Sequence, residues 1–163
     1  MRSPSSRLAE LGLTLPALAA PLGAYVPAVR VGELIYSSGQ LPIVDGRLVA
    51  TGKVGGEVSA DEAAECARIA ALNGLAAVAD EAGDLDAIAQ VIKVLVFVSS
   101  ASDFTGQPHV GNGASQLLRD VFGHAGQHAR SAVGVAVLPS DAPVEVELIV
   151  RAQAVARVQP VAM

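Results

Sequence analysis

The sequence predicts a single α+β domain in which a mostly antiparallel sheet carries two helices on one face. Strand-like and helix-like segments alternate in the order β-β-α-β-α-β-β, with no internal repeat. The length of 163 residues fits one domain. Hydrophobic residues make up 52% of the chain but aromatic residues only 3%, so the core is built from Ala, Val, Leu and Ile. We place one domain over residues 1–163, with an N-terminal extension to about residue 20 and a loose tail from about residue 154.

The first two expected strands cover Ala24–Val31 and Glu33–Ser38, which are short, rich in β-branched residues and separated by glycine. The dipeptide Asp45-Gly46 then predicts a tight turn in the segment after Leu41-Pro42. These features indicate the antiparallel part of the sheet.

The first helix begins with a capping box, because Ser59 is followed three residues later by Glu62. Its alanine-rich pattern continues to Gly83, a typical stop signal. Apolar residues recur at helical spacing and predict the stripe that lies on the sheet, namely Ile69, Leu72, Leu75, Val78 and Ala79.

The second half of the chain predicts three strands and one helix. Gln90–Ser99 is a nearly continuous β-branched run, which favours a strand buried on both faces. A helix is expected over Asn112–Phe122, closed by Gly123. Two further strands, Ser131–Leu138 and Val144–Arg151, are joined by the turn-rich segment from Pro139 to Pro143. The last strand places Glu145, Glu147 and Arg151 on one face and its valines and leucine on the other.

Charge and cysteine content exclude several classes of protein. The formal net charge is −5 and there is no Lys/Arg run, so nucleic acid is not expected as a partner. The only cysteine, Cys66, cannot form an internal disulfide and lies in the middle of the long helix, where a small buried thiol is the better reading. Glu10, Gly12 and Pro16 interrupt the apolar N-terminal stretch, which argues against a signal peptide. No segment is long and apolar enough to span a membrane, and the cytoplasm is the expected location.

Motifs for metals and nucleotides are missing from the sequence. The three histidines, His109, His124 and His128, form neither an H-E-x-x-H nor an H-x-H pattern, so no metal is predicted. There is no G-x-S-x-G, no P-loop and no G-x-G-x-x-G, and no cofactor is expected.

Two charged residues in the C-terminal strands are the candidates for chemistry. Arg130 opens an apolar strand, where a guanidinium suits two-point capture of a carboxylate, although a salt bridge at the rim would look the same. Glu145 lies in an otherwise hydrophobic strand and could position water, although strand alternation alone would also place it on a solvated face. The pattern of residues leaves both interpretations open.

Several runs together resemble one family. The longest starts at His128-Ala129-Arg130-Ser131-Ala132-Val133 and continues through Leu138-Pro139 to Val144-Glu145-Val146-Glu147. Upstream, the matching runs are Gly23-Ala24-Tyr25-Val26, Ser38-Gly39-Gln40-Leu41-Pro42 and Lys93-Val94-Leu95-Val96-Phe97-Val98, the last followed by Asp103-Phe104. The chain is thereby identified as similar to the Rid family, the reactive intermediate deaminases or YjgF-like proteins, from about Tyr25 to Arg151.

The resemblance implies a chorismate-mutase-like fold of the bacillus type, assembled as a homotrimeric barrel with ligand clefts between subunits. It also implies hydrolysis of small carboxylated enamines and imines to 2-oxo acids and ammonia, without metal or cofactor. Arg130 would bind the substrate carboxylate and Glu145 would position the attacking water. Tyr25, Gly39, Asn112 and Ala132 would line the cleft.

Three positions depart from the deaminase branch of that family. His128 stands where proline is usual, Ala132 where a pocket cysteine is usual and Gly134 where an acidic residue is usual. Retention of Arg130 and Glu145 favours an enzyme, whereas Ala132 leaves room for a second reading, a non-catalytic trimer that binds a small ligand or has a regulatory role. A third reading, a ribonuclease or translation inhibitor, is weakened by the acidic charge balance.

The predicted topology also indicates an assembly. Two helices can cover only one face of the sheet, so an apolar second face would have to be buried by other copies of the chain. If the last two strands form a hairpin about Asp141, Arg130 and Glu145 lie roughly 20 Å apart at ~3.3 Å per residue. A site that uses both would then combine residues of different subunits.

Overall fold

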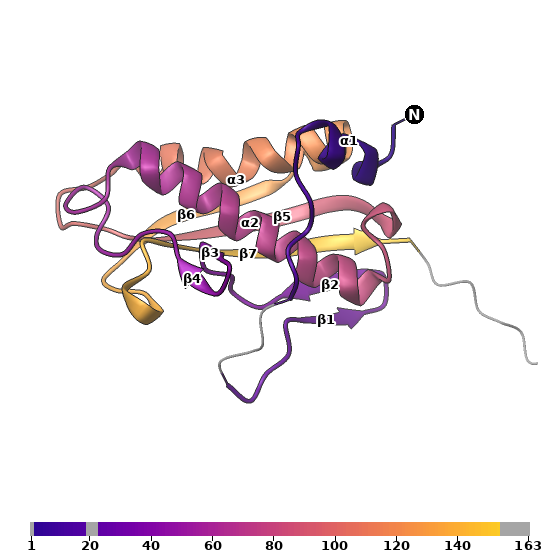
Figure 1. The fold of residues 1–163 in the computed structure, drawn as a ribbon, viewed down its shortest axis with the longest axis horizontal. Helices are drawn as coiled ribbons and strands as arrows, with labels where there is room; N and C mark the ends of the chain where they lie inside the picture. The colour runs from indigo at the N-terminus through magenta and orange to yellow at the C-terminus, as the bar shows by residue number, and fades with distance from the viewer. Residues whose placement is uncertain (1, 19–22, 154–163) are drawn as a thin grey trace, which may run out of the picture.

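The computed structural model describes residues 2–18 and 23–153, which form one α+β unit (Figure 1). The predicted fold class is therefore confirmed. The helices are α1 (Pro4–Glu10), α2 (Ala60–Ala82) and α3 (Gln107–Phe122), with 3₁₀ turns η1 (Leu85–Ala87), η2 (Gly123–Gly126) and η3 (Pro139–Asp141). The strands are β1 (Ala28–Val31), β2 (Leu34–Ser37), β3 (Ile43–Val44), β4 (Arg47–Leu48), β5 (Ile88–Ser99), β6 (Ala129–Val135) and β7 (Val144–Ala152).

The main sheet has five strands in the order β1-β2-β7-β5-β6. Every neighbouring pair is antiparallel except β5 and β6, which run parallel. Strands β3 and β4 form a separate hairpin around the predicted Asp45-Gly46 turn. Helices α2 and α3 lie together on one side of the main sheet (Figure 1). The hydrophobic core is the layer between these helices and the sheet.

Helix α2 has the ends that the sequence predicts. The Ser59 hydroxyl accepts a hydrogen bond from the Glu62 N–H, and the Glu62 carboxylate accepts one from the Ser59 N–H. Gly83 closes the helix at φ +89°, in the left-handed region that favours glycine. Leu75 is completely buried, and Cys66 is only 3% exposed. Burial raises the pKa of the Cys66 thiol to about 11, which keeps it in the unreactive thiol form.

Helix α3 is longer than expected, because it begins at Gln107 instead of Asn112. The added residues include Gly111, and Gly113 follows just inside the predicted helix; each glycine lowers helix propensity by about 1 kcal/mol, which weakens the helical pattern at this end. Packing explains why glycine is present. A Cβ on Gly113 would overlap the Ala64 carbonyl oxygen of α2, so the glycine allows the two helices to approach closely.

Strands β6 and β7 do not form the predicted hairpin. Each of them pairs with β5, which lies between them, and the connection through η3 crosses the end of β5. Strand β6 runs over Ala129–Val135, two residues earlier at its start and three earlier at its end than the predicted Ser131–Leu138. The pattern of alternation could not distinguish the two topologies, because it is the same whichever neighbour a strand pairs with.

The prediction that β5 is buried on both faces is wrong for the chain by itself. Val91, Val94, Val96 and Val98 are fully buried under the helices, whereas the alternate residues Lys93, Leu95 and Phe97 are only partly covered. The same alternation holds in β7, where Glu145 and Glu147 share one face as predicted. This is the face of the sheet opposite α2 and α3, called the open side below. The open side also carries apolar residues with large exposed fractions, namely Val29 (50%), Val31 (67%), Tyr36 (38%) and Val133 (45%).

Part of the N-terminal extension is ordered and packed. Pro4–Glu10 forms α1, which the sequence reading did not predict, and Leu8 is buried in the core. The Ser5 N–H and hydroxyl both donate to the Asp86 carboxylate, which attaches α1 to η1. The predicted loose tail from about residue 154 lies outside the described residues. In the described part of the chain, none of the helices has the length and apolarity needed to cross a membrane.

Candidate functional site

Arg130 is held against α3 by three hydrogen bonds. Its Nη1 donates to Asn112 Oδ1 at 2.9 Å and to Ser115 Oγ at 3.1 Å. Its Nη2 donates to the carbonyl of Pro108 at 3.2 Å. All three acceptors lie on successive turns of α3, so the helix fixes the plane of the guanidinium. Asn112, predicted to line a cleft, therefore contacts the predicted anchor directly.

The guanidinium has donors left over after these contacts. It carries five N–H groups, of which the three bonds to α3 occupy three. Within residues 2–18 and 23–153, Nε–H and one Nη2–H have no acceptor. Nε and Nη2 lie on one edge of the guanidinium, the edge at which a carboxylate can be bound at two points. The arrangement can therefore bind an anion in a defined orientation.

Small residues around Arg130 make room for this geometry. A Cβ on Gly111 would lie only 3.1 Å from Arg130 Nη1 and 3.3 Å from the Ala132 Cβ. A Cβ on Gly134 would lie 2.9 Å from the amide nitrogen of Gln107, which donates to the Phe104 carbonyl. Gly134 thus gives the space that the first turn of α3 needs. Ala132 packs against the core and presents a methyl group beside Arg130.

Ser115 and His128 extend the Arg130 network, and sequence reasoning assigned neither of them a role. Ser115 Oγ lies 3.0 Å from His128 Nε2, and His128 Nδ1 lies 2.7 Å from the Gly126 carbonyl oxygen. Burial lowers the pKa of the His128 imidazole, and the positive charges of Arg130 and Arg119 lower it further. The signal in the sequence is the histidine two residues before the arginine, at the position where the deaminase branch usually has proline.

Glu145 is partly buried on the open side of β7. Burial raises the pKa of its carboxyl, and the negative charge of Glu147 adds to that rise. A Cβ on Gly39 would overlap Glu145 Oε1, so a glycine is needed for the carboxylate to lie against this backbone. The predicted cleft residue Gly39 is therefore in contact with the predicted water-positioning residue.

Tyr25 lies on the segment that leads into β1 and is half exposed. Two hydrogen bonds connect this segment to Ser38, the neighbour of Gly39: Ser38 Oγ donates to the Val26 carbonyl and Ser38 N–H to the Pro27 carbonyl. Tyr25 therefore belongs to the same end of the sheet as Gly39 and Glu145.

The predicted site residues thus form two groups in one chain. The arginine group consists of Arg130, Asn112 and Ala132 and faces α3, whereas the glutamate group consists of Glu145, Gly39 and Tyr25. Arg130 is opposite Val94 of β5 and Glu145 is opposite Phe97, on the other side of that strand. Three residues along a strand and two strand spacings give a Cα separation of roughly 14 Å. The two side chains also point to opposite faces, so one chain does not bring them together.

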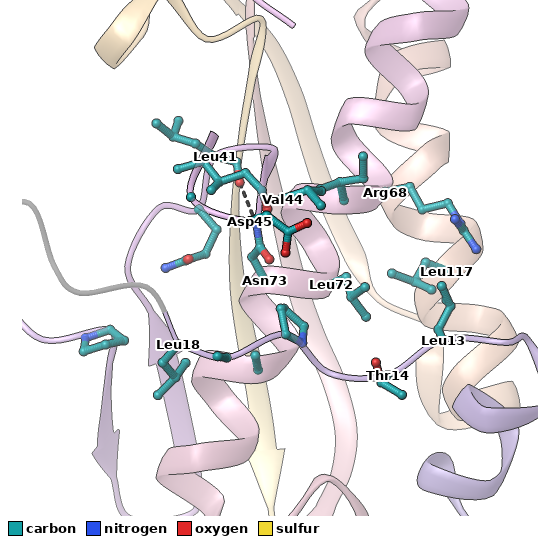
Figure 2. Close-up of a pocket in the computed structure, with 18 residues that line it drawn as sticks. Leu13, Thr14, Leu18, Leu41, Val44, Asp45, Arg68, Leu72, Asn73 and Leu117 are labelled. Carbon is teal, nitrogen blue, oxygen red and sulfur yellow. Dashed lines mark hydrogen bonds between the residues drawn. The ribbon is translucent and has the colours of Figure 1, made fainter. Parts of the chain in front are cut away.

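A pocket of about 630 Å³ lies elsewhere, between the N-terminal segment, α2 and the β3–β4 hairpin (Figure 2). Most of its lining is apolar, including Leu13, Leu18 and Leu72. Asn73 in its wall donates to the carbonyls of Leu41 and Ile43, which holds the hairpin against α2. None of the predicted site residues lines this pocket.

The side chain of His109 forms its hydrogen bond outside the arginine group. His109 Nε2 lies 2.7 Å from Asp61 Oδ1 in an exposed pair at the start of the two helices. Among the described residues, no group of three or more His, Cys, Asp or Glu side chains is arranged to hold a metal ion.

The fold and the two groups define a class of protein: a small α+β domain with a strand-borne arginine fixed by a helix. A sequence model described as "YjgF/chorismate mutase-like, putative endoribonuclease" matches residues 5–151. The chain belongs to this YjgF/chorismate mutase-like family, which confirms both the resemblance and the chorismate-mutase-like fold.

Individual relatives agree with that assignment. Protein TCP17 of Trypanosoma cruzi is 44% identical over 147 residues, which cover 90% of this chain and 92% of the relative. A 2-iminobutanoate/2-iminopropanoate deaminase of Dermatophagoides farinae is 33% identical over 138 residues, or 85% and 93% of the two chains. The crystal structure of Atu1372 from Agrobacterium tumefaciens, a protein of unknown function, superposes with a TM-score of 0.85 at 45% identity, covering 93% of this chain and 94% of the other.

Proposed function

We propose that this protein hydrolyses small carboxylated enamines and imines to 2-oxo acids and ammonia, at sites between the subunits of a homotrimer. The observation that carries the proposal is the Arg130 guanidinium, which α3 fixes while two N–H donors, one on Nε and one on Nη2, stay available. Relatives named as 2-iminobutanoate/2-iminopropanoate deaminases support the same reaction.

Arg130 would bind and orient the substrate. A carboxylate that accepts hydrogen bonds from Nε–H and Nη2–H lies in the plane of the guanidinium, so the adjoining C=N carbon has a defined position. Because α3 already fixes that plane, little conformational entropy is lost on binding.

Glu145 would hold the attacking water. A carboxyl group whose pKa is raised by burial is a stronger base than a solvated one, so it accepts a proton from water more readily. The water oxygen adds to the iminium carbon while its proton passes to Glu145, giving a carbinolamine. Return of that proton to the nitrogen makes ammonia the leaving group. As the C–N bond breaks, the carbinolamine hydroxyl gives its proton to Glu145 and becomes the carbonyl of the 2-oxo acid. The ammonia takes this proton from Glu145 and leaves as ammonium, which restores the carboxylate. No oxidant, reductant or further reactant is required.

A trimer would bring the arginine group of one chain to the glutamate group of the next. The open side of the sheet exposes Val29, Val31, Tyr36 and Val133, which is apolar area that another subunit can bury. We expect light scattering to give three times the chain mass at micromolar concentration. A monomeric mass under those conditions would contradict the shared site.

Mixed trimers test the shared site directly. Arg130→Ala and Glu145→Gln chains should each be inactive alone, but co-expressed in equal amounts they should recover about a quarter of wild-type turnover. This follows because half of the chains retain each residue, and a site needs both from different chains. Turnover is measured as ammonia release from an enamine generated in situ, compared with the spontaneous rate.

The control for this experiment is the double variant Arg130→Ala/Glu145→Gln mixed with wild type. In that mixture the intact sites also require two wild-type contributions, so it should show the same fraction. Failure of the single variants to complement each other, while this control recovers activity, would place both residues in one chain. No acceleration by the wild-type protein would contradict the deaminase proposal itself.

A non-catalytic binding protein is the second candidate. The observation in its favour is Ala132, because a methyl group beside Arg130 supplies no group that reacts with substrate. Such a protein would bind small carboxylates through Arg130 without any acceleration of ammonia release.

A further inference from the structure

The hydrogen bonds around Arg130 continue to a serine and a histidine whose directions can be assigned. The Gly126 carbonyl oxygen can only accept, so His128 Nδ1, at 2.7 Å, must carry a hydrogen. In the neutral ring Nε2 is then an acceptor, and the Ser115 hydroxyl at 3.0 Å must donate to it. The Ser115 oxygen keeps a lone pair for the Arg130 Nη1–H at 3.1 Å.

We propose that Ser115 and His128 are positioning residues, which form a one-directional chain of hydrogen bonds from Gly126 that fixes the Arg130 guanidinium for carboxylate binding. This inference rests on the proposed role of Arg130 as the anchor and adds two residues that its assignment did not include. Neither residue would touch the substrate.

The Gly126 end of this hydrogen-bond chain is fixed, which makes it a suitable support for the other members. A Cβ on Gly126 would overlap the Leu118 carbonyl oxygen of α3, so η2 packs directly against that helix. The Gly126 carbonyl is therefore fixed relative to the same helix that carries Ser115 and Asn112. Arg130 is held from two directions, by Asn112 and by the Ser115–His128 pair.

Protonation of His128 would reverse the direction of the hydrogen bond between Ser115 and His128. A protonated ring donates from both nitrogens, so Ser115 would have to accept from His128 Nε2 and could no longer donate to it. The charged groups that face the ring are Arg130 on β6 and Arg119 on α3, and both repel a positive imidazolium. Together with burial they hold the pKa of His128 below its usual value, so the neutral, positioning form predominates at pH 7.

The first test changes Ser115 and measures turnover at pH 7. Ser115→Ala should raise KM for the carboxylated substrate about 5- to 10-fold and change kcat less than about 2-fold. The reason is that a loosened guanidinium spends less time in the binding orientation, while a bound carboxylate restores that orientation. Gln116→Ala, on the exposed side of the same helix, is the matched control and should leave both constants unchanged.

The second test distinguishes two properties of His128: its ability to accept a hydrogen bond from Ser115 and its ability to become positively charged. His128→Gln supplies an uncharged acceptor for Ser115, so KM at pH 7 should stay within about 2-fold of wild type. The wild-type KM should rise as the pH falls below about 6.5, and His128→Gln should remove that rise. His128→Phe should raise KM at pH 7 as Ser115→Ala does. His124→Gln, in the 3₁₀ turn that carries Gly126, is the control and should keep the wild-type pH profile.

Nuclear magnetic resonance of the side chains gives a readout that needs no turnover. We expect the ¹⁵N shifts of His128 to identify the neutral ring with its hydrogen on Nδ1, and the Arg130 Nη signals to broaden or merge in Ser115→Ala. A hydrogen on Nε2 at pH 7, or Arg130 signals and KM unchanged by Ser115→Ala in the folded protein, would overturn the inference. If wild-type protein releases no ammonia, the proposed function fails, and these spectra still decide whether the pair positions Arg130.

Discussion

Replacing Arg130 by alanine is expected to remove most deaminase activity while the fold and the assembly persist. A charge-assisted contact to a carboxylate contributes on the order of 1.5–3 kcal/mol, which corresponds to roughly a 10- to 150-fold loss of binding. Turnover should fall further, because a substrate without its anchor no longer presents the C=N carbon to the water. Arg130→Lys should recover little, since an ammonium group cannot offer two parallel donors in a plane.

Thermal unfolding of the same variants distinguishes an anchor from a structural salt bridge. No carboxylate of the described residues pairs with Arg130, whose partners are an amide, a hydroxyl and a backbone carbonyl. Water can replace the guanidinium at these acceptors, so the melting temperature should change little. Arg47→Ala in the exposed β4 strand is the control for loss of an arginine. Wild-type turnover by the folded Arg130→Ala protein would remove Arg130 from the mechanism and favour the binding protein.

The largest expected effect on stability comes from Gly113→Ala. Helix propensity alone would make this change favourable by about 1 kcal/mol, because alanine is the best helix former and glycine one of the worst. The new Cβ, however, would overlap the backbone oxygen of Ala64, which cannot rotate away as a side chain can. Helices α2 and α3 would have to separate, and we expect a loss of about 3 kcal/mol or more in the free energy of unfolding.

Urea denaturation measures this effect, with Gly56→Ala as the matched control. A Cβ on Gly56 would lie 3.5 Å from the nearest atom, an ordinary contact, so that change should alter the free energy of unfolding by less than about 0.5 kcal/mol. An increase in stability for Gly113→Ala would mean that α2 and α3 are farther apart than the structure places them.

Features that depend on neighbouring residues were predictable from the sequence. The ends of α2 follow from Ser59, Glu62 and Gly83, whose capping contacts are local and form wherever the helix packs. The alternation of β7 follows from the two-residue period of a strand, which places Glu145 on the open side once the valines are buried. The family resemblance then supplied the roles that we propose for Arg130 and Glu145, which composition and spacing left undecided.

Helix α3 marks the limit of that local reading. The predicted helix lacked the first five residues of α3, because Gly111, with Gly113 close after it, weakens the helical pattern in the sequence. In the structure their lack of a side chain lets Arg130 and Ala64 approach the helix. The sequence does not show whether a glycine is present because another segment packs closely against it or because it forms a turn. Only the neighbouring residues in the folded structure distinguish the two cases.

The fold class, the cap of α2 and the faces of β7 could thus be predicted from local patterns, because each pattern involves residues within a few positions of one another. The tertiary structure decided that β5 lies between β6 and β7, since strand pairing is a choice among distant partners with equal alternation. It also decided that Arg130 and Glu145 face opposite sides of the sheet. The Ser115–His128 pair could be found only there, because it forms where a helix, a 3₁₀ turn and an edge strand meet.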